Sequence, residues 1–180
     1  MKRHLFIKNR SNASGKNISN DLRPFPCHFV CSRRLEPINM RARFPVTVHL
    51  FFLRENQILL LRRFNTGFRD GEYSVPAGHL DGGETVMAAA IREAKEEVGV
   101  DLVMDDMVFS SVMHRIEDDE RVDFFVHVRK WQGELFNAEP EKCDDLRWAE
   151  IDALPVNTIP YVKQALGNHL NDIPFDEYKL

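Results

Sequence analysis

The sequence has few cysteines and no long apolar run. Its three cysteines, Cys27, Cys31 and Cys143, form no disulfide framework and indicate a reducing compartment. No apolar stretch approaches the roughly 20 residues that a membrane-spanning helix needs, and none precedes a small-residue cleavage site. We therefore expect a soluble, cytoplasmic protein with no membrane partner.

The net charge is small, but the charged residues are unevenly distributed along the sequence. The 180 residues, 43% of them hydrophobic, suffice for one compact domain with a sizeable core. Residues 1–39 carry eight Lys and Arg against two acidic residues, a balance of +6, so the net charge of −4 leaves −10 on the remainder. An acidic body argues against nucleic acid as a partner, because phosphate contacts need a basic surface.

Strand-like and helix-like segments alternate from Phe44 onward. A mixed sheet flanked by helices, an α/β fold, is the architecture that such an order favours. Apolar patterns and turn residues predict strands at 45–53, 58–63, 73–75, 107–116, 121–131 and 146–151, and helices within 84–98 and at 159–170.

The stretch from Gly78 to Val100, GHLDGGETVMAAAIREAKEEVGV, organises the chain. Gly82 and Gly83 supply a turn, Thr85 suits a helix start, and Gly99 suits its end. Apolar residues then recur at helical spacing on one arc, which we expect to face a core. They are Met87, Ala90, Ile91, Ala94 and Val98.

Three acids, Glu93, Glu96 and Glu97, fall on a neighbouring arc of the same helix, so their carboxylates can converge. Like charges at this spacing repel, and clustered hard oxygen ligands suit Mg²⁺ or Mn²⁺. Arg92 is the one cation within the cluster. The alternative is an ordinary acidic helix face exposed to solvent.

The order Gly78, five residues, Glu84, seven residues, then Arg92-Glu93-Ala94-Lys95-Glu96-Glu97-Val98-Gly99-Val100 resembles the signature of the Nudix hydrolase family. Ala94 is the soft match, since the family usually has a larger aliphatic residue there. The resemblance is specific within 78–100, looser over the rest of 44–170, and does not cover 1–39. It implies a Nudix-type α/β/α sandwich with a mixed β-sheet.

The resemblance also implies a chemistry, the divalent-metal-dependent hydrolysis of a phosphoanhydride. Glu93, Glu96 and Glu97 would bind Mg²⁺ or Mn²⁺ with help from the Gly78 carbonyl, and in many members the residue matching Glu93 takes the proton from water. Arg92 would pair with Glu84 and orient the catalytic helix.

Assignments outside the signature are less specific. Alternation puts Arg62 and Arg63 on opposite faces of their strand, so only one of them can face the site, and the resemblance to nucleotide-hydrolysing members implies Arg63 as the phosphate ligand. His79 stands where several relatives carry Lys, and it is either a second phosphate ligand or a structural histidine of the loop. Asn157 either reads a purine edge or caps a helix. The resemblance also implies that a later loop can supply the general base, for which Glu139 and Glu141 are candidates, and the alternative for both is an ordinary polar loop. The acidic turn at 117–120 could approach the ions, although a charged hairpin tip is usually solvated.

The resulting expectation is a small-molecule nucleotide diphosphate substrate. A nucleoside triphosphate cleaved to monophosphate and pyrophosphate is favoured. A dinucleoside polyphosphate, a nucleotide sugar and a non-catalytic nucleotide-binding module are the alternatives, and a homodimer is left open.

Residues 1–39 have no sustained period and contain three prolines, which indicates a poorly ordered basic extension before a domain at 40–180. A transit peptide is one alternative. We favour another, that Met40 is the natural start.

Deleting residues 1–39 should leave both the melting temperature and the turnover nearly unchanged, because ordered-looking sequence begins only after Met40. Thermal unfolding and a rate assay on the full and shortened chains would test this. A large loss of either property would refute it.

Overall fold

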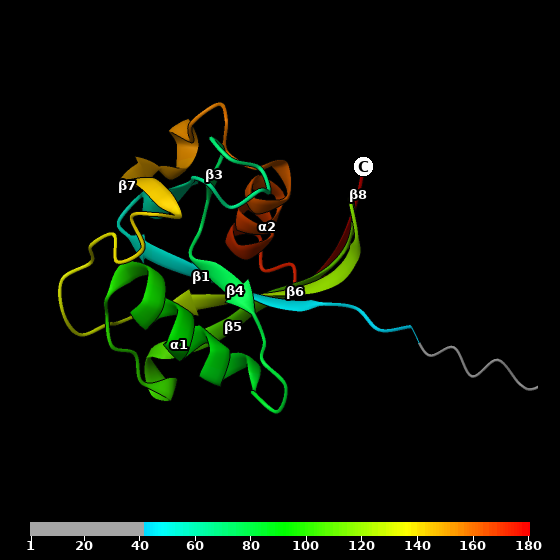
Figure 1. Ribbon diagram of the computed structural model, residues 1–180, viewed down its shortest axis with the longest axis horizontal. Helices are drawn as coiled ribbons and strands as arrows, with labels where there is room; N and C mark the ends of the chain where they lie inside the picture. Colours follow the sequence, from blue (N-terminus) through cyan, green and yellow to red (C-terminus); the bar gives the residue numbers. More distant parts are fainter. Residues whose placement is uncertain (1–41) are drawn as a thin grey trace, which may run out of the picture. The chain divides into compact units, whose positions relative to one another are not determined.

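The computed structural model describes residues 42–180, and the expectation for residues 1–39 lies outside them. Strands and helices are arranged as a mixed sheet with a helix on either side (Figure 1). The elements are β1 (Val46–Arg54), β2 (Gln57–Arg63), β3 (Tyr73–Ser74), β4 (Ala77–His79), α1 (Val86–Val98), the 3₁₀ turn η1 (Met104–Asp106), β5 (Met107–Ile116), β6 (Glu120–Val128), β7 (Cys143–Glu150), the 3₁₀ turn η2 (Ile151–Ala153), α2 (Pro160–Leu170) and β8 (Phe175–Lys179).

The sheet runs in the order β3-β2-β1-β6-β5-β8, with β4 paired to β1 and β7 paired to β2. The pairs β1–β6 and β5–β8 are parallel, and the others are antiparallel. The hairpin expected from β1 and β2 is present, but the two strands pair only near its turn, at Leu53–Ile58 and Arg54–Gln57. They then separate, so that β4 pairs with the start of β1 and β7 pairs with β2.

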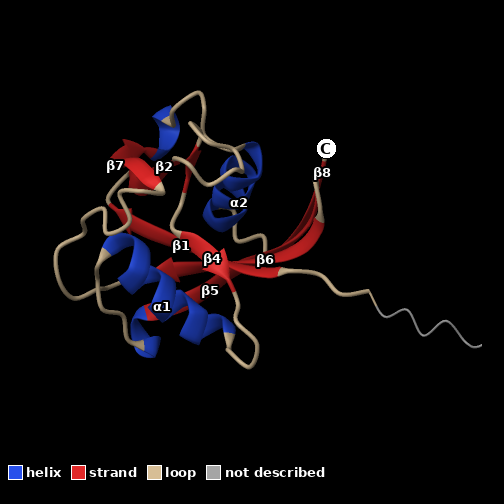
Figure 2. Ribbon diagram, viewed as in Figure 1, coloured by secondary structure: helices blue, strands red, loops and turns tan. Residues whose placement is uncertain are grey.

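Alternation along β1 builds two cores, one on each face of the sheet. Val48, Leu50 and Phe52 pack with the buried residues of α1, whereas Phe51 packs with those of α2. Figure 2 shows the two helices on opposite sides of the strands. This confirms the predicted α/β fold with a mixed sheet between helices.

Two strands escaped prediction. β8 (FDEYK) is an edge strand that is held by backbone pairing with β5. Because only one of its side chains is buried, its sequence shows no apolar alternation that would predict a strand. β4 is only three residues long and includes Gly78. Other boundaries differ by a few residues, since β6 ends at Val128 and β7 begins at Cys143.

The acidic hairpin tip between β5 and β6 is solvated as predicted at Asp118, Asp119 and Glu120, of which the last two have side chains 39% and 41% exposed, but not at Glu117. The side chain of Glu117 is only 4% exposed and forms ion pairs with Arg69 and Arg115. Arg115 is itself buried and donates from Nε to Asp123 at 2.6 Å. The charges therefore compensate one another inside the protein, beneath the N-terminal half of α2, where the Arg115 guanidinium stacks on the Tyr161 ring.

None of the helices within residues 42–180 combines the length and the apolar character needed to span a bilayer.

Candidate active site

A cavity of about 560 Å³ opens where α1 faces β4 and the end of β2. Its lining is rich in charged side chains of both signs, and it includes most of the residues that the sequence singled out. The residues are Leu61, Arg63, Asn65, Thr66, Ala77, Gly78, His79, Asp81, Arg92, Glu93, Glu96, Glu97, Glu139, Lys142 and Cys143.

The ends of α1 fix which side chains reach this cavity. Thr85 caps the helix by accepting a hydrogen bond from the Ala88 N–H at 3.2 Å, and Gly99 ends it in the left-handed region at φ 74°. Ala90, Ala94 and Val98 are buried against the sheet as predicted. The neighbouring arc, which carries the three acids, is thereby turned towards β4.

Two of the three acids lie directly against the backbone of β4. A Cβ added at Gly78 would stand 1.8 Å from Oε1 of Glu93, so the Glu93 carboxylate occupies the space that any other residue would fill. Glu97 accepts a hydrogen bond from the Ala77 N–H at 2.8 Å. Strand and helix therefore fit together through these carboxylates, and any side chain at position 78 would have to displace the Glu93 carboxylate.

Replacing Gly78 by Ala should displace the Glu93 side chain and lower both divalent-ion affinity and turnover, by about 10-fold to 100-fold. Calorimetric titration with Mn²⁺ would measure the ion affinity independently of catalysis. Gly82→Ala is the matched control, because a Cβ at Gly82 would meet nothing within 4 Å. Equal Mn²⁺ binding by the two variants would contradict the expectation.

Arg92 gathers the acidic groups around it. Its guanidinium donates to Glu84 at 2.9 and 3.1 Å, to Glu93 at 2.5 Å and to Glu96 at 3.1 Å. It also donates to the His79 carbonyl at 2.9 Å. The expected pairing with Glu84 is thus present, and the same guanidinium ties the start of α1 to β4.

Two of the acids, Glu93 and Glu97, remain difficult to ionise despite Arg92. Burial raises the pKa of Glu97 to about 8, and the charges of Glu93 and Glu139 act in the same direction. Burial also raises the pKa of Glu93, although Arg92 opposes the shift. A cation of higher charge placed among these carboxylates would relieve both effects.

The donor set fits a hard divalent ion. It consists of carboxylates with a backbone carbonyl beside them, the oxygen ligands that Mg²⁺ and Mn²⁺ prefer. Within residues 42–180, no three His, Cys, Asp or Glu side chains already stand in an ion-binding arrangement. Glu93 and Glu96 are held by Arg92 and Glu97 by Ala77, so ion binding would require these side chains to turn.

The two neighbouring arginines at the end of β2 diverge, as alternation predicts. Arg63 lines the cavity and is held by the Phe68 carbonyl at 2.7 Å and the Thr66 hydroxyl at 3.0 Å. Arg62 lies outside it and forms a two-point ion pair with Asp144 at 2.7 and 2.9 Å. Arg63 is therefore the one of the two that can meet a ligand in this cavity.

The other two residues predicted to bind substrate, His79 and Asn157, differ in their position relative to the cavity. His79 lines the cavity, and both desolvation and the Arg121 guanidinium lower its pKa, which favours a neutral imidazole at pH 7. Asn157 is not part of the cavity lining, and its amide donates to the Gly71 carbonyl at 2.7 Å. Its alternative role as a helix cap is wrong, because the N-cap of α2 is Ile159.

The later loop brings Glu139 into the cavity but not Glu141. It also brings Lys142, whose ammonium group donates to Glu139 at 2.7 Å. Sequence reasoning missed Lys142, and its spacing of three residues from Glu139 was the only signal. None of the four residues of the acidic turn at 117–120 lines the cavity.

Comparison with known proteins decides the family. The family model described as the NUDIX domain matches residues 43–168, more than half of the chain. This chain belongs to the Nudix family. The match covers β1 to α2 almost completely, so every cavity-lining residue lies within the Nudix domain.

A solved Nudix structure shares the fold. The MutT NUDIX hydrolase from Burkholderia pseudomallei superimposes with a TM-score of 0.65 at 25% identity, covering 71% of this chain and 98% of that one. The similarity therefore extends over the whole of the smaller protein.

Curated relatives share part of their length with this Nudix domain. An NAD-capped RNA hydrolase NudC from Stutzerimonas stutzeri is 32% identical over 123 residues, 67% of this chain and 40% of that protein. An ADP-ribose pyrophosphatase from Methanocaldococcus jannaschii is 45% identical over 68 residues, 38% of this chain and 40% of that protein. The chain thus aligns with less than half the length of either relative.

Proposed function

We propose that the chain hydrolyses a phosphoanhydride bond in a nucleoside diphosphate linked to another moiety, using Mg²⁺ or Mn²⁺. The observation that carries this proposal is the convergence of Glu93, Glu96 and Glu97 in one cavity with Arg63, with Glu93 and Glu97 against the backbone of β4. Clustered carboxylates would repel a diphosphate by themselves. Together with divalent ions they would attract it.

Glu93, Glu96, Glu97 and the Gly78 carbonyl would hold the ions. Bound there, divalent ions neutralise phosphate charge and lower the pKa of water, which offsets the two reasons why phosphoanhydrides resist hydrolysis. Arg92 keeps the acids oriented through its bonds to Glu84, Glu93 and Glu96. Its role is orientation, and its own charge is largely used within the cluster.

The remaining steps are assigned to side chains around the cavity. Arg63 lines the cavity and would donate to a phosphate oxygen, and His79, also in the lining, would be a neutral donor. Water attacks phosphorus, its proton passes to a carboxylate, and the bridging P–O bond breaks with its electron pair on the departing phosphate. Glu93 and Glu139 both line the cavity and could accept that proton, and we favour Glu139, because Glu93 is already assigned to hold the ions.

A nucleoside triphosphate, cleaved to monophosphate and pyrophosphate, is the substrate we propose. The second candidate is a diphosphate bridging a nucleoside and another sugar or nucleoside. The names of two relatives, which specify an NAD cap and ADP-ribose, favour it. The residues that touch the diphosphate would serve both classes equally.

An assay of phosphate or pyrophosphate release across a nucleotide panel with Mg²⁺ tests the proposal. The panel should include nucleoside triphosphates, dinucleoside polyphosphates, ADP-ribose and nucleotide sugars. We expect turnover of at least one class and its abolition by EDTA. Nucleotide binding without turnover of any compound would instead assign a non-catalytic binding module.

A further inference from the structure

The loop that carries Glu139 also places a cation beside it. Lys142 donates from Nζ to Oε1 of Glu139 at 2.7 Å, and both side chains line the cavity. The Glu139 side chain is 22% exposed and that of Lys142 is 56% exposed. Glu139 is therefore the more buried partner of the pair and Lys142 the more exposed one.

The backbone on either side of this pair is tied to the catalytic framework. The Ala138 N–H donates to the Glu97 carbonyl at 3.0 Å, which joins the loop to the end of α1. The Phe64 N–H donates to the Lys142 carbonyl at 2.8 Å, which joins it to the end of β2. The Lys142 N–H closes a turn on the Glu139 carbonyl at 2.9 Å. These hydrogen bonds fix the backbone of the loop, but they do not determine the direction of the Glu139 side chain.

Electrostatic repulsion works against the direction that is observed. The negative charge of Glu139 is close enough to contribute to the raised pKa of both Glu93 and Glu97, after the larger effect of burial. Of the other two cations that line the cavity, Arg92 is paired with the acids of its own cluster, and Arg63 donates to Thr66 and the Phe68 carbonyl rather than to Glu139. An acidic side chain at position 139 would turn towards solvent without a counter-charge of its own.

We propose that Lys142 is a positioning residue for the hydrolysis: its ammonium group holds the Glu139 carboxylate at the cavity wall, facing the acids of α1. The proposal rests on the function proposed above and deepens it, because a carboxylate held there can accept the proton of the attacking water. Lys142 acts through Glu139 and touches no reacting atom.

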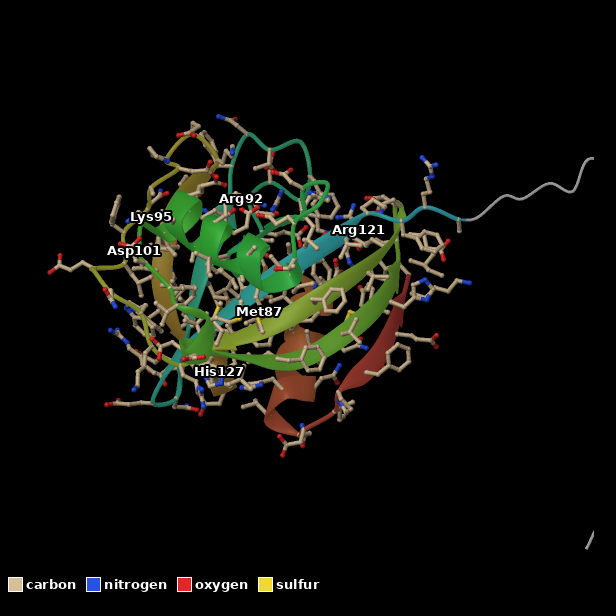
Figure 3. The ribbon with its side chains drawn as sticks, turned by 90° about the horizontal axis from the view of Figure 1, so that it is seen from below. Met87, Arg92, Lys95, Asp101, Arg121 and His127 are labelled. Atoms are coloured by element: carbon tan, nitrogen blue, oxygen red, sulfur yellow. The ribbon has the colours of Figure 1, made fainter. Side chains whose placement is uncertain are left out.

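A second Lys–acid pair supplies the matched control. Lys95 donates to Asp101 at 2.9 Å, and the Lys95 side chain is 55% exposed, nearly the same as that of Lys142. Lys95, on α1, and Asp101, just after its end, lie together (Figure 3). Neither residue lines the cavity. Exposed pairs of this kind contribute only about 0.2–1 kcal/mol to stability, so each should be removable without unfolding the protein.

The test is a double-mutant cycle on the full chain with its best substrate at saturating Mg²⁺. The variants are Lys142→Met, Glu139→Gln, the two combined, Lys142→Arg and Lys95→Met. We expect Lys142→Met to lower kcat by about 10-fold to 100-fold, as loss of an orienting partner does, with KM and melting temperature nearly unchanged. In the Glu139→Gln background the same change should cost nothing further, and Lys142→Arg should restore most of the rate.

Each departure from this pattern overturns the inference. A rise in KM with unchanged kcat would make Lys142 a substrate contact, and independent losses in the double variant would give it a role separate from Glu139. A Glu139→Gln variant with full activity, or a Lys142→Met variant equal to Lys95→Met, would remove the role altogether. Failure of the wild-type chain to hydrolyse any compound would instead refute the proposed function, and this inference with it.

Discussion

Replacing Glu97 by Gln is expected to lower kcat by about 10³-fold or more, equivalent to about 4 kcal/mol of transition-state stabilisation. The substitution removes a charged ligand of the proposed ion site but keeps the shape of the side chain. Its carbonyl can still accept the hydrogen bond from Ala77. Glu96→Gln should behave similarly, although Glu96 is more exposed. Steady-state rates and Mn²⁺ titration would measure both losses.

The fold should survive the Glu97→Gln change, and the pH dependence of stability gives the reason. Folding raises the pKa of Glu97 from 4.5 to about 8, so the folded state retains a proton that the unfolded chain releases. In metal-free buffer, stability therefore falls as the pH rises from about 4.5 to 8. The variant lacks this contribution, and its melting temperature at pH 8 should equal or exceed that of the wild type.

Glu141→Gln is the control for these variants, because Glu141 is an acid that the sequence also offered as a candidate but that does not line the cavity. It should retain turnover within about twofold of the wild type. Near-normal turnover by both Glu96→Gln and Glu97→Gln would refute the assignment of the ion ligands.

Replacing Asp123 by Asn should destabilise the domain by about 3–5 kcal/mol, the usual cost of leaving one partner of a buried ion pair unpaired. Asp123 is fully buried, accepts from Arg115 at 2.6 Å and lies 3.4 Å from Nε2 of His49. The variant keeps the volume but removes the charge that faces Arg115. For a domain of this size the melting temperature should fall by on the order of 10 °C.

Acid unfolding provides a second readout of the same residue. Burial alone would raise the pKa of Asp123, yet His49 and Arg115 outweigh it and hold the pKa at about 2. A depressed pKa stabilises the folded state above the ordinary value of 3.8, and this contribution is lost as the pH falls towards 2. The Asp123→Asn variant should lack that part of the acid-induced loss.

Asp144→Asn is the matched control, because Asp144 also pairs with an arginine, Arg62, but in a partly exposed position. The side chain of Asp144 is 33% exposed and that of Arg62 is 38% exposed. Loss of this pair should cost no more than about 1 kcal/mol. If the two variants unfold at the same temperature, the Arg115–Asp123 pair does not have the structural role assigned to it here.

Local patterns were sufficient to predict most of the framework. The helix at 86–98, its cap and its buried arc follow from short-range spacing, because a helix repeats every 3.6 residues and its ends need specific residue types. The same holds for the main strands. β4 and β8 were missed because their stability comes from backbone pairing with β1 and β5, which leaves little trace in side-chain hydrophobicity.

The sequence by itself determined the family, through the fixed spacing of the signature at 78–100. Periodicity within one element was enough for the acidic face of α1 and for placing Arg62 and Arg63 on opposite faces of β2, and the resemblance to the family then favoured Arg63. Only the tertiary structure decided that Glu139 rather than Glu141 lies in the cavity, that Asn157 lies outside its lining, and that Glu117 is buried. These positions depend on which loops the sheet brings together. Side-chain partners distant in sequence, such as Arg69 for Glu117, are set by that packing and by the need to pair every buried charge.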